Sequence, residues 1–184
     1  VLMGPRGSGK STFIELQLAA YGPLAAVFGL EDLEDSAFGL AHLVGKRVAM
    51  ATEGFGDRYV QKTGILNRMI SGEPITINQK HVRIQQIRLR AKLLWALNDM
   101  FRVKSGEDGL LRRLYIVQWP ELPEEERDPS LRVRIQGEAA GFLAWAVEGL
   151  KRLRARGHFE IPASVKRANA EYEREQNHEL QFLE

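Results

Sequence analysis

A run of nine residues near the start of the chain limits its fold more than any other feature. They match the pattern G-x-x-x-x-G-K-[ST] of the P-loop, which wraps the phosphates of a nucleotide, and they are Gly4, Pro5, Arg6, Gly7, Ser8, Gly9, Lys10, Ser11 and Thr12. The glycines allow backbone conformations that a Cβ forbids. The loop amides and the N-terminal end of the next helix attract anions. We expect Lys10 to reach the β- and γ-phosphates, and the Ser11 hydroxyl to bind Mg²⁺.

The residues on either side of this motif support the interpretation. Residues 1–3 are apolar, as at the end of a buried strand, and residues 13–20 have the composition of a helix. A flexible glycine and serine turn that matched the pattern by chance would have no reason to lie between a strand and a helix. The motif therefore predicts an α/β fold of the P-loop NTPase type, with a central parallel sheet flanked by helices.

The composition narrows the class of protein further. The 184 residues, 44% of them hydrophobic, suffice for one domain or for one domain with a small appendage. A formal net charge of only +2 means that any nucleic-acid site must be local. The absence of cysteine excludes disulfides and favours a reducing cytoplasm, and no apolar run reaches the length of a membrane span. Because the chain begins almost at the P-loop, we expect it to be a fragment of a longer protein.

Two predicted strands end in polar side chains that suit ATP hydrolysis. Residues 46–53 are predicted as a short buried strand that ends at Glu53, and residues 92–98 as a second buried strand that ends at Asn98. A P-loop ATPase needs an acid at a strand end to hold Mg²⁺ or to polarise the attacking water, and Asn98 could orient that water. The alternatives are that Glu53 is an ordinary strand-end residue and that Asn98 is a turn residue.

The middle of the chain combines a predicted hairpin with a concentration of positive charge. After a helix over residues 57–71, strands over 75–77 and 82–84 are joined by a tip at 78–81 that contains Lys80 and His81. Between residues 74 and 98 there are five Lys or Arg and no Asp or Glu, and Arg88, Arg90 and Lys92 alternate with apolar residues. This indicates a strand with one exposed basic face, which is either a binding surface or a solvated sheet edge.

The remaining segments set the predicted domain boundaries. Residues 23–45 are predicted as helix and loop, and Arg112 and Arg113 enter an apolar strand over 110–117, as edge charges or as an arginine finger for a neighbouring subunit. An acidic linker over 121–128 precedes helices at 137–156 and 162–178. We predict an ATPase core over residues 1–120 and a small C-terminal helical appendage over 121–184.

The order of these motifs resembles that of the superfamily 3 helicases, and more narrowly the primase–helicase proteins of phages, plasmids and large DNA viruses. The resemblance covers nearly the whole chain, and its strongest single motif is the P-loop. It implies an AAA+-type core that assembles into hexameric rings and uses ATP to translocate on single-stranded DNA. It also implies a host cytoplasmic location if the gene is carried by a phage, and it raises the question of a primase domain upstream.

The resemblance implies a role for each matching residue. Lys10 and Ser11 correspond to the Walker A lysine and Mg²⁺ ligand, Glu53 to the Walker B acid and Mg²⁺ site, and Asn98 to sensor 1. Lys80 and His81 correspond to the DNA-contacting tip of a hairpin inserted into the core. Either Arg112 or Arg113 corresponds to the finger.

Two alternatives to the helicase hypothesis remain. One is a P-loop phosphotransferase or nucleotide-binding switch that does no work on DNA, which stimulation of ATP hydrolysis by DNA would exclude. The other is a helicase-derived module without turnover, because Thr52 precedes Glu53 where many relatives carry a second acid.

Overall fold

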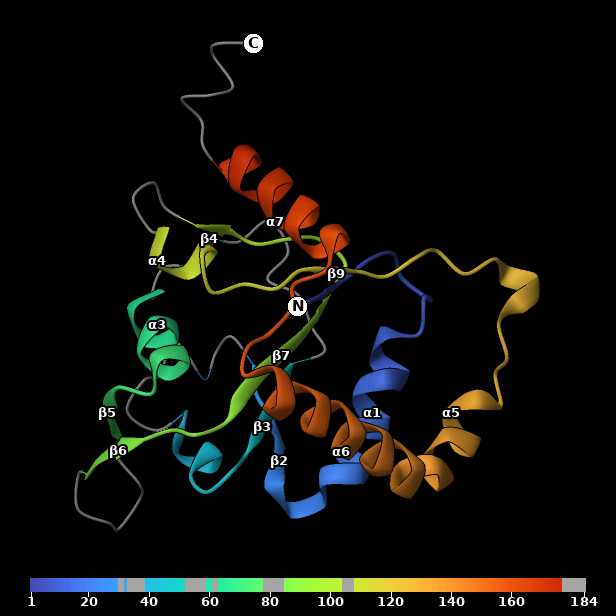
Figure 1. The fold of residues 1–184 in the computed structure, drawn as a ribbon, viewed down its shortest axis with the longest axis horizontal. Helices are drawn as coiled ribbons and strands as arrows, with labels where there is room; N and C mark the ends of the chain where they lie inside the picture. Colours follow the sequence, from blue (N-terminus) through green and yellow to red (C-terminus); the bar gives the residue numbers. More distant parts are fainter. Residues whose placement is uncertain are drawn as a thin grey trace.

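A five-stranded parallel sheet forms the centre of the molecule (Figure 1). The structure is a computed structural model that describes residues 1–29, 32, 39–51, 59–60, 63–77, 85–103 and 108–176. The strand order is β2-β3-β7-β1-β9, and every neighbouring pair is parallel. The strands are β1 (Leu2–Met3), β2 (Ala25–Val27), β3 (Val48–Ala51), β7 (Lys92–Leu97) and β9 (Val117–Gln118). The predicted α/β fold with a central parallel sheet is confirmed.

The apolar strand sequences fit a sheet that is covered on both faces. Successive side chains of a strand point to opposite faces, so Ala49 and Ala51 lie in one core cluster while Met50 lies in another. Helix α1 (Lys10–Tyr21) covers one face with Ile14, and helix α3 (Thr63–Ser71) covers the other with Leu66 and Met69.

The described part of the chain contains the predicted hairpin. Strand β5 (Pro74–Ile77) pairs antiparallel with β6 (Gln85–Arg88), and Ile77 is opposite Gln85. The second strand was predicted over 82–84, but these residues and the tip with Lys80 and His81 lie outside the described residues. On the following segment Arg88, Arg90 and Lys92 are exposed while Leu89 and Ala91 are buried, so the predicted exposed basic face is confirmed.

Three predicted elements differ from the structure. Strand β2 lies in a segment that was predicted as helix and loop. The helix predicted over 57–71 is α3, which begins at Thr63, because Tyr59–Val60 forms strand β4 beside β8 (Arg102–Val103). The strand predicted over 110–117 was wrong in most of its length, since α4 (Asp108–Leu111) includes its first two residues and only its last residue, Val117, is strand. Its apolar residues Leu110, Leu114 and Ile116 are buried all the same. The pattern therefore predicted burial correctly, but Leu110 is buried on a helix, and Leu114 and Ile116 are buried on irregular backbone.

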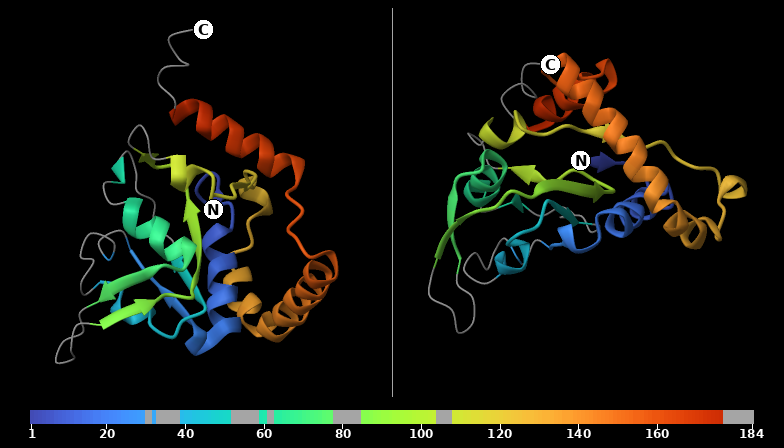
Figure 2. Two further views of the ribbon diagram at one scale, coloured as in Figure 1. Left: turned by 60° about the vertical axis from the view of Figure 1, so that its left-hand side comes forward. Right: turned by 60° about the horizontal axis from the view of Figure 1, so that its bottom comes forward.

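The C-terminal helices pack on two parts of the core (Figure 2). Helix α6 (Ala139–Arg156) lies along α1, where the Phe142 ring meets Phe13 and Tyr21 at centroid distances of 6.0 and 6.4 Å. Helix α7 (Ala163–Gln176) buries Tyr172 in the main core, where its hydroxyl donates a hydrogen bond to the Phe101 carbonyl. Both predicted helices are confirmed, and the boundary at residue 120 stays a prediction.

Short helical segments complete the described chain. They are η1 (Gly22–Leu24), η2 (Ala41–Leu43), η3 (Glu124–Glu126), α5 (Leu131–Arg134) and η4 (Ile135–Glu138). Across the described ranges, no helix combines the length and apolar character needed to cross a membrane.

Candidate functional site

The glycine-rich loop (residues 4–9) connects β1 to α1 at the carboxyl edge of the sheet, where ligands of open α/β sheets bind. Gly7 and Gly9 have φ angles of 77° and 89°, in the left-handed region that favours glycine. The Gly9 carbonyl accepts a hydrogen bond of 3.0 Å from the Phe13 amide, so the helix begins at Lys10, three residues earlier than predicted. The positive end of the α1 dipole therefore lies inside the turn of the loop.

The Lys10 side chain is folded into this loop and is only 5% exposed. Its Nζ donates hydrogen bonds to the carbonyls of Gly4 (2.6 Å) and Pro5 (2.7 Å) and to Oγ of Ser8 (3.1 Å). All three acceptors are neutral, and within the described residues no carboxylate pairs with Lys10. Burial lowers the pKa of Lys10. A buried ammonium without a counter-ion is costly, so the loop holds a cation for which a bound anion would compensate.

The middle of the glycine-rich loop faces outward. Pro5, Arg6 and Gly7 are exposed, and Ser11, the second residue of α1, is exposed as well. The hydroxyl of Ser11 is therefore accessible for the predicted Mg²⁺ contact. The described ranges contain no cluster of three or more metal-binding side chains, and Glu53, the other predicted metal residue, lies outside the described residues.

Asn98 lies directly beside the glycine-rich loop. Strand β7 is the neighbour of β1, with Leu97 opposite Met3, and the Gly4 amide donates a hydrogen bond of 3.1 Å to the Leu97 carbonyl. Asn98 follows Leu97 and is exposed. The sheet thus brings Lys10, Ser11 and Asn98 to one edge.

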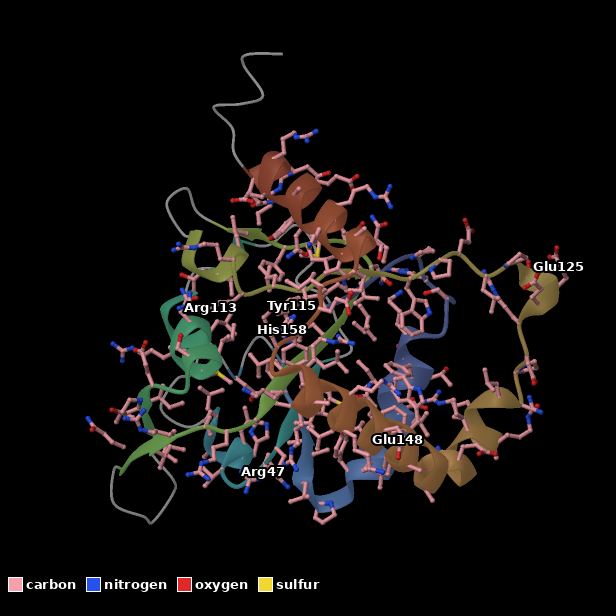
Figure 3. All side chains as sticks on the ribbon, in the orientation of Figure 1. Arg47, Arg113, Tyr115, Glu125, Glu148 and His158 are labelled. Carbon is pink, nitrogen blue, oxygen red and sulfur yellow. The ribbon has the colours of Figure 1, made fainter. Side chains whose placement is uncertain are left out.

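The two candidate finger arginines lie elsewhere. Arg112 and Arg113 are exposed and follow helix α4 rather than entering a strand. Arg113 donates a hydrogen bond to the Gly109 carbonyl. Figure 3 shows Arg113 beside α3 and α4, far across the molecule from Glu125 of η3 and away from the start of α1. The structure therefore does not bring Arg113 to the glycine-rich loop of its own chain.

Two residues contact the glycine-rich loop that the sequence did not indicate. The Trp119 amide donates a hydrogen bond of 2.6 Å to the Met3 carbonyl, and its indole Nε1 donates to the Ser8 carbonyl. Its ring lies 5.4 Å from that of Phe13. Arg127, in the linker, lies over Gly7, because a Cβ at Gly7 would be 3.1 Å from the guanidinium carbon. The one signal in the sequence was an aromatic residue, Trp119, two positions after the last predicted core strand.

The fold and the loop define an α/β protein with a parallel sheet and a glycine-rich, lysine-containing loop at its carboxyl edge. The chain belongs to the family described as a family of unknown function (DUF5906), whose model matches residues 2–113. That span includes the glycine-rich loop, Asn98 and both candidate finger arginines.

The chain also resembles solved structures of the NrS-1 C-terminal region. The A form apo structure of that region is 21% identical, with a TM-score of 0.61, over 77% of this chain and 33% of the other. A second apo structure of the region is 18% identical, with a TM-score of 0.58 and the same coverage. This chain spans about one third of the length of the structures it matches, and the similarity establishes a shared fold.

Proposed function

We propose that this chain is the ATPase core of a replicative DNA helicase of the superfamily 3 type, which hydrolyses ATP in a hexameric ring and translocates on single-stranded DNA. The observation that carries the proposal is the Lys10 ammonium, buried inside the glycine-rich loop with neutral partners only. A nucleoside triphosphate is the anion whose phosphates such a loop can wrap.

Each residue around the loop has a separate role in the proposed phosphoryl transfer. Lys10 exchanges its carbonyl acceptors for β- and γ-phosphate oxygens, while the exposed amides around Gly7 and the α1 dipole hold the remaining charge. The Ser11 hydroxyl ligates Mg²⁺, together with Glu53, and Mg²⁺ when bound neutralises charge that develops on the phosphate oxygens. Glu53 polarises the attacking water, and Asn98, beside the loop, orients it.

The position of the arginines supports a ring. A finger that stabilises the γ-phosphate must approach it closely, and Arg113 lies across the molecule from its own loop (Figure 3). Arg113 or its neighbour Arg112 therefore serves the active site of an adjacent subunit. A hexamer supplies one such contact to every site.

Exposed basic residues at the end of the hairpin and just after it support a DNA contact. Arg88, Arg90 and Lys92 are exposed along the segment that follows the connection containing Lys80 and His81. A motor that moves along any sequence should bind phosphates, because phosphate contacts carry no sequence information. The proposed partner is therefore single-stranded DNA, gripped at Lys80 and His81. An upstream primase domain and a phage or plasmid origin belong to the same proposal.

The test compares two pairs of substitutions in the full-length protein. Lys80→Ala with His81→Ala removes the proposed DNA grip, and Lys151→Ala with His158→Ala removes one lysine and one histidine at exposed positions of the C-terminal part. We expect the first pair to retain basal ATP hydrolysis and to lose DNA stimulation and unwinding, while the second pair behaves as wild type. Each lost cation should reduce the slope of log affinity against log salt by roughly 0.7 on single strands.

Two results would contradict the proposal. If the Lys80 and His81 pair unwinds DNA as well as wild type, the hairpin is a solvated sheet edge. If wild type hydrolyses or transfers phosphate without any response to DNA, the phosphotransferase or switch hypothesis replaces the helicase.

A further inference from the structure

The linker after β9 passes directly beside the glycine-rich loop. Trp119 is the first residue after β9, and its indole N–H donates a hydrogen bond to the Ser8 carbonyl. Arg127 lies eight residues later in the sequence, and its side chain lies close to Gly7. Figure 1 shows the chain running from β9 past the start of α1 before it reaches η3. The linker is therefore a neighbour of the proposed phosphate site and not only a connection to the C-terminal helices.

The guanidinium of Arg127 is turned towards the loop. From a Cβ built on Gly7, Cζ of Arg127 is 3.1 Å away and both terminal nitrogens are 3.3 Å away. The third nitrogen, Nε, donates a hydrogen bond of 3.2 Å to the Leu122 carbonyl, which fixes the plane of the group. Because Cζ is nearer to this Cβ position than either terminal nitrogen, the guanidinium lies with its flat face over Gly7. Its two terminal nitrogens, which bind phosphate oxygens in pairs, therefore lie beside the loop and are directed along its surface.

The acidic residues of the linker do not neutralise Arg127. Its neighbour Asp128 pairs with Arg134 and accepts hydrogen bonds from Ser130. Throughout the described part of the chain, no carboxylate lies within ion-pair distance of Arg127. Arg127 therefore keeps its positive charge unpaired among the described carboxylates. Because Lys10 lies within the same loop, two cations are available there for one anion.

We propose that Arg127 is a further phosphate-binding residue, which contacts the bound nucleotide from the same chain that supplies the glycine-rich loop. The proposal rests on the nucleotide binding proposed above. Lys10 holds the phosphates from inside the loop and Arg127 holds them from outside. Arg127 differs from Arg112 and Arg113 because it acts within one subunit and needs no ring. Its ligand is the polyphosphate of a nucleoside di- or triphosphate, and it makes no contribution to base recognition.

The experiment measures binding of ADP and of inorganic tripolyphosphate, in Mg²⁺, to the full-length protein by calorimetry. The variants are Arg127→Ala, which removes the group, and Arg127→Lys, which keeps the charge without the fork. Arg154→Ala, an exposed arginine on α6, is the matched control, and Lys10→Ala reports on the glycine-rich loop. Urea unfolding of each variant establishes that the fold is unchanged.

We expect Arg127→Ala to weaken both ligands by about tenfold or more, the loss typical of one charge-assisted hydrogen bond. Arg127→Lys should recover part of the affinity, and Arg154→Ala should bind as wild type. Equal losses for ADP and tripolyphosphate identify the phosphates as the contact.

Two outcomes overturn the inference, and they are distinguishable. If Arg127→Ala binds both ligands as wild type does, while Lys10→Ala has lost them, Arg127 has no phosphate contact and the proposed function stands. If wild type binds neither ligand, the nucleotide site itself is wrong, and the role of Arg127 fails with it.

Discussion

Replacing Gly4 with alanine tests the closest contact in the candidate site. A Cβ at Gly4 would lie 2.2 Å from the carbonyl oxygen of Trp119, well inside the 3.0 Å below which real Cβ contacts essentially never fall. The φ angle of Gly4 is outside the left-handed region, so alanine suits the backbone conformation itself. The whole cost of Gly4→Ala therefore comes from the space that the Trp119 backbone occupies.

The size of the effect follows from how firmly both segments are held. To remove the clash between the new Cβ and the Trp119 carbonyl oxygen, β1 and the end of β9 must move apart by at least about 0.8 Å. Gly4 is fixed on one side by its hydrogen bond to Leu97, and Trp119 is fixed by its hydrogen bonds to Met3 and Ser8. Overpacking of this kind costs about 1–3 kcal/mol, and each hydrogen bond lost adds about 1 kcal/mol. We expect Gly4→Ala to lower the free energy of unfolding by about 2–4 kcal/mol.

Urea unfolding followed by circular dichroism measures this loss. With a typical slope of about 2 kcal/mol per M, the midpoint should fall by about 1–2 M. The matched control is Gly137→Ala, because nothing lies within 4 Å of a Cβ at that position; its stability should be unchanged or higher by up to about 1 kcal/mol. A Gly4→Ala variant that unfolds at the wild-type urea concentration would refute the packing of Trp119 against the glycine-rich loop.

Two further substitutions test the polar contacts around the core. Burial, and secondarily the charge of Glu175, raises the pKa of Tyr172 above its ordinary value of 10.0. The stability that Tyr172 contributes is therefore complete below about pH 10 and is lost as the pH rises further. Tyr172→Phe should cost about 1 kcal/mol at pH 7 and reduce the alkaline loss in urea unfolding; an equal alkaline loss in both proteins would contradict this. Trp119→Phe keeps an aromatic ring beside Phe13 but removes the hydrogen bond to Ser8, so ADP binding measured by calorimetry should weaken about fivefold, and unchanged affinity would exclude a positioning role.

The features that the sequence predicted are those with a local pattern. The glycine-rich motif predicted a loop between a strand and a helix, and this loop connects β1 to α1. The apolar run before Asn98 predicted a strand, and β7 ends at Leu97, directly before Asn98. The alternation around Arg88, Arg90 and Lys92 predicted an exposed basic face because side-chain direction in extended chain depends only on spacing.

Elements without such a pattern were predicted poorly. Strand β2 has only three residues, and it is strand because it pairs with β3, more than twenty residues later in the sequence. The apolar residues Leu110, Leu114 and Ile116 have the composition of a strand, and only their burial proved correct. Short strands depend on partners that a single segment does not reveal.

The contacts of Trp119 and Arg127 with the glycine-rich loop could not be predicted from a local sequence pattern either, because they depend on strand pairing between distant segments. Trp119 meets Ser8 across 111 positions of sequence because β9 pairs with β1. Arg127 was counted only as part of an acidic linker, and its position over Gly7 follows from that pairing and from the course of the chain after it. The roles of Glu53, Lys80 and His81 remain predictions from the sequence, because these residues lie outside the described ranges.

The central claim is that this fold hydrolyses ATP at the glycine-rich loop to drive movement on DNA. The most direct measurement is the rate of Mg²⁺-dependent ATP hydrolysis by the full-length protein, with and without single-stranded DNA, for wild type and Lys10→Ala. Lys166→Ala, an exposed lysine on α7, is the matched control. We predict that DNA accelerates hydrolysis in wild type and in Lys166→Ala, and that Lys10→Ala hydrolyses no ATP under either condition. Hydrolysis by Lys10→Ala at the wild-type rate, or a wild-type rate that DNA does not change, would contradict the account.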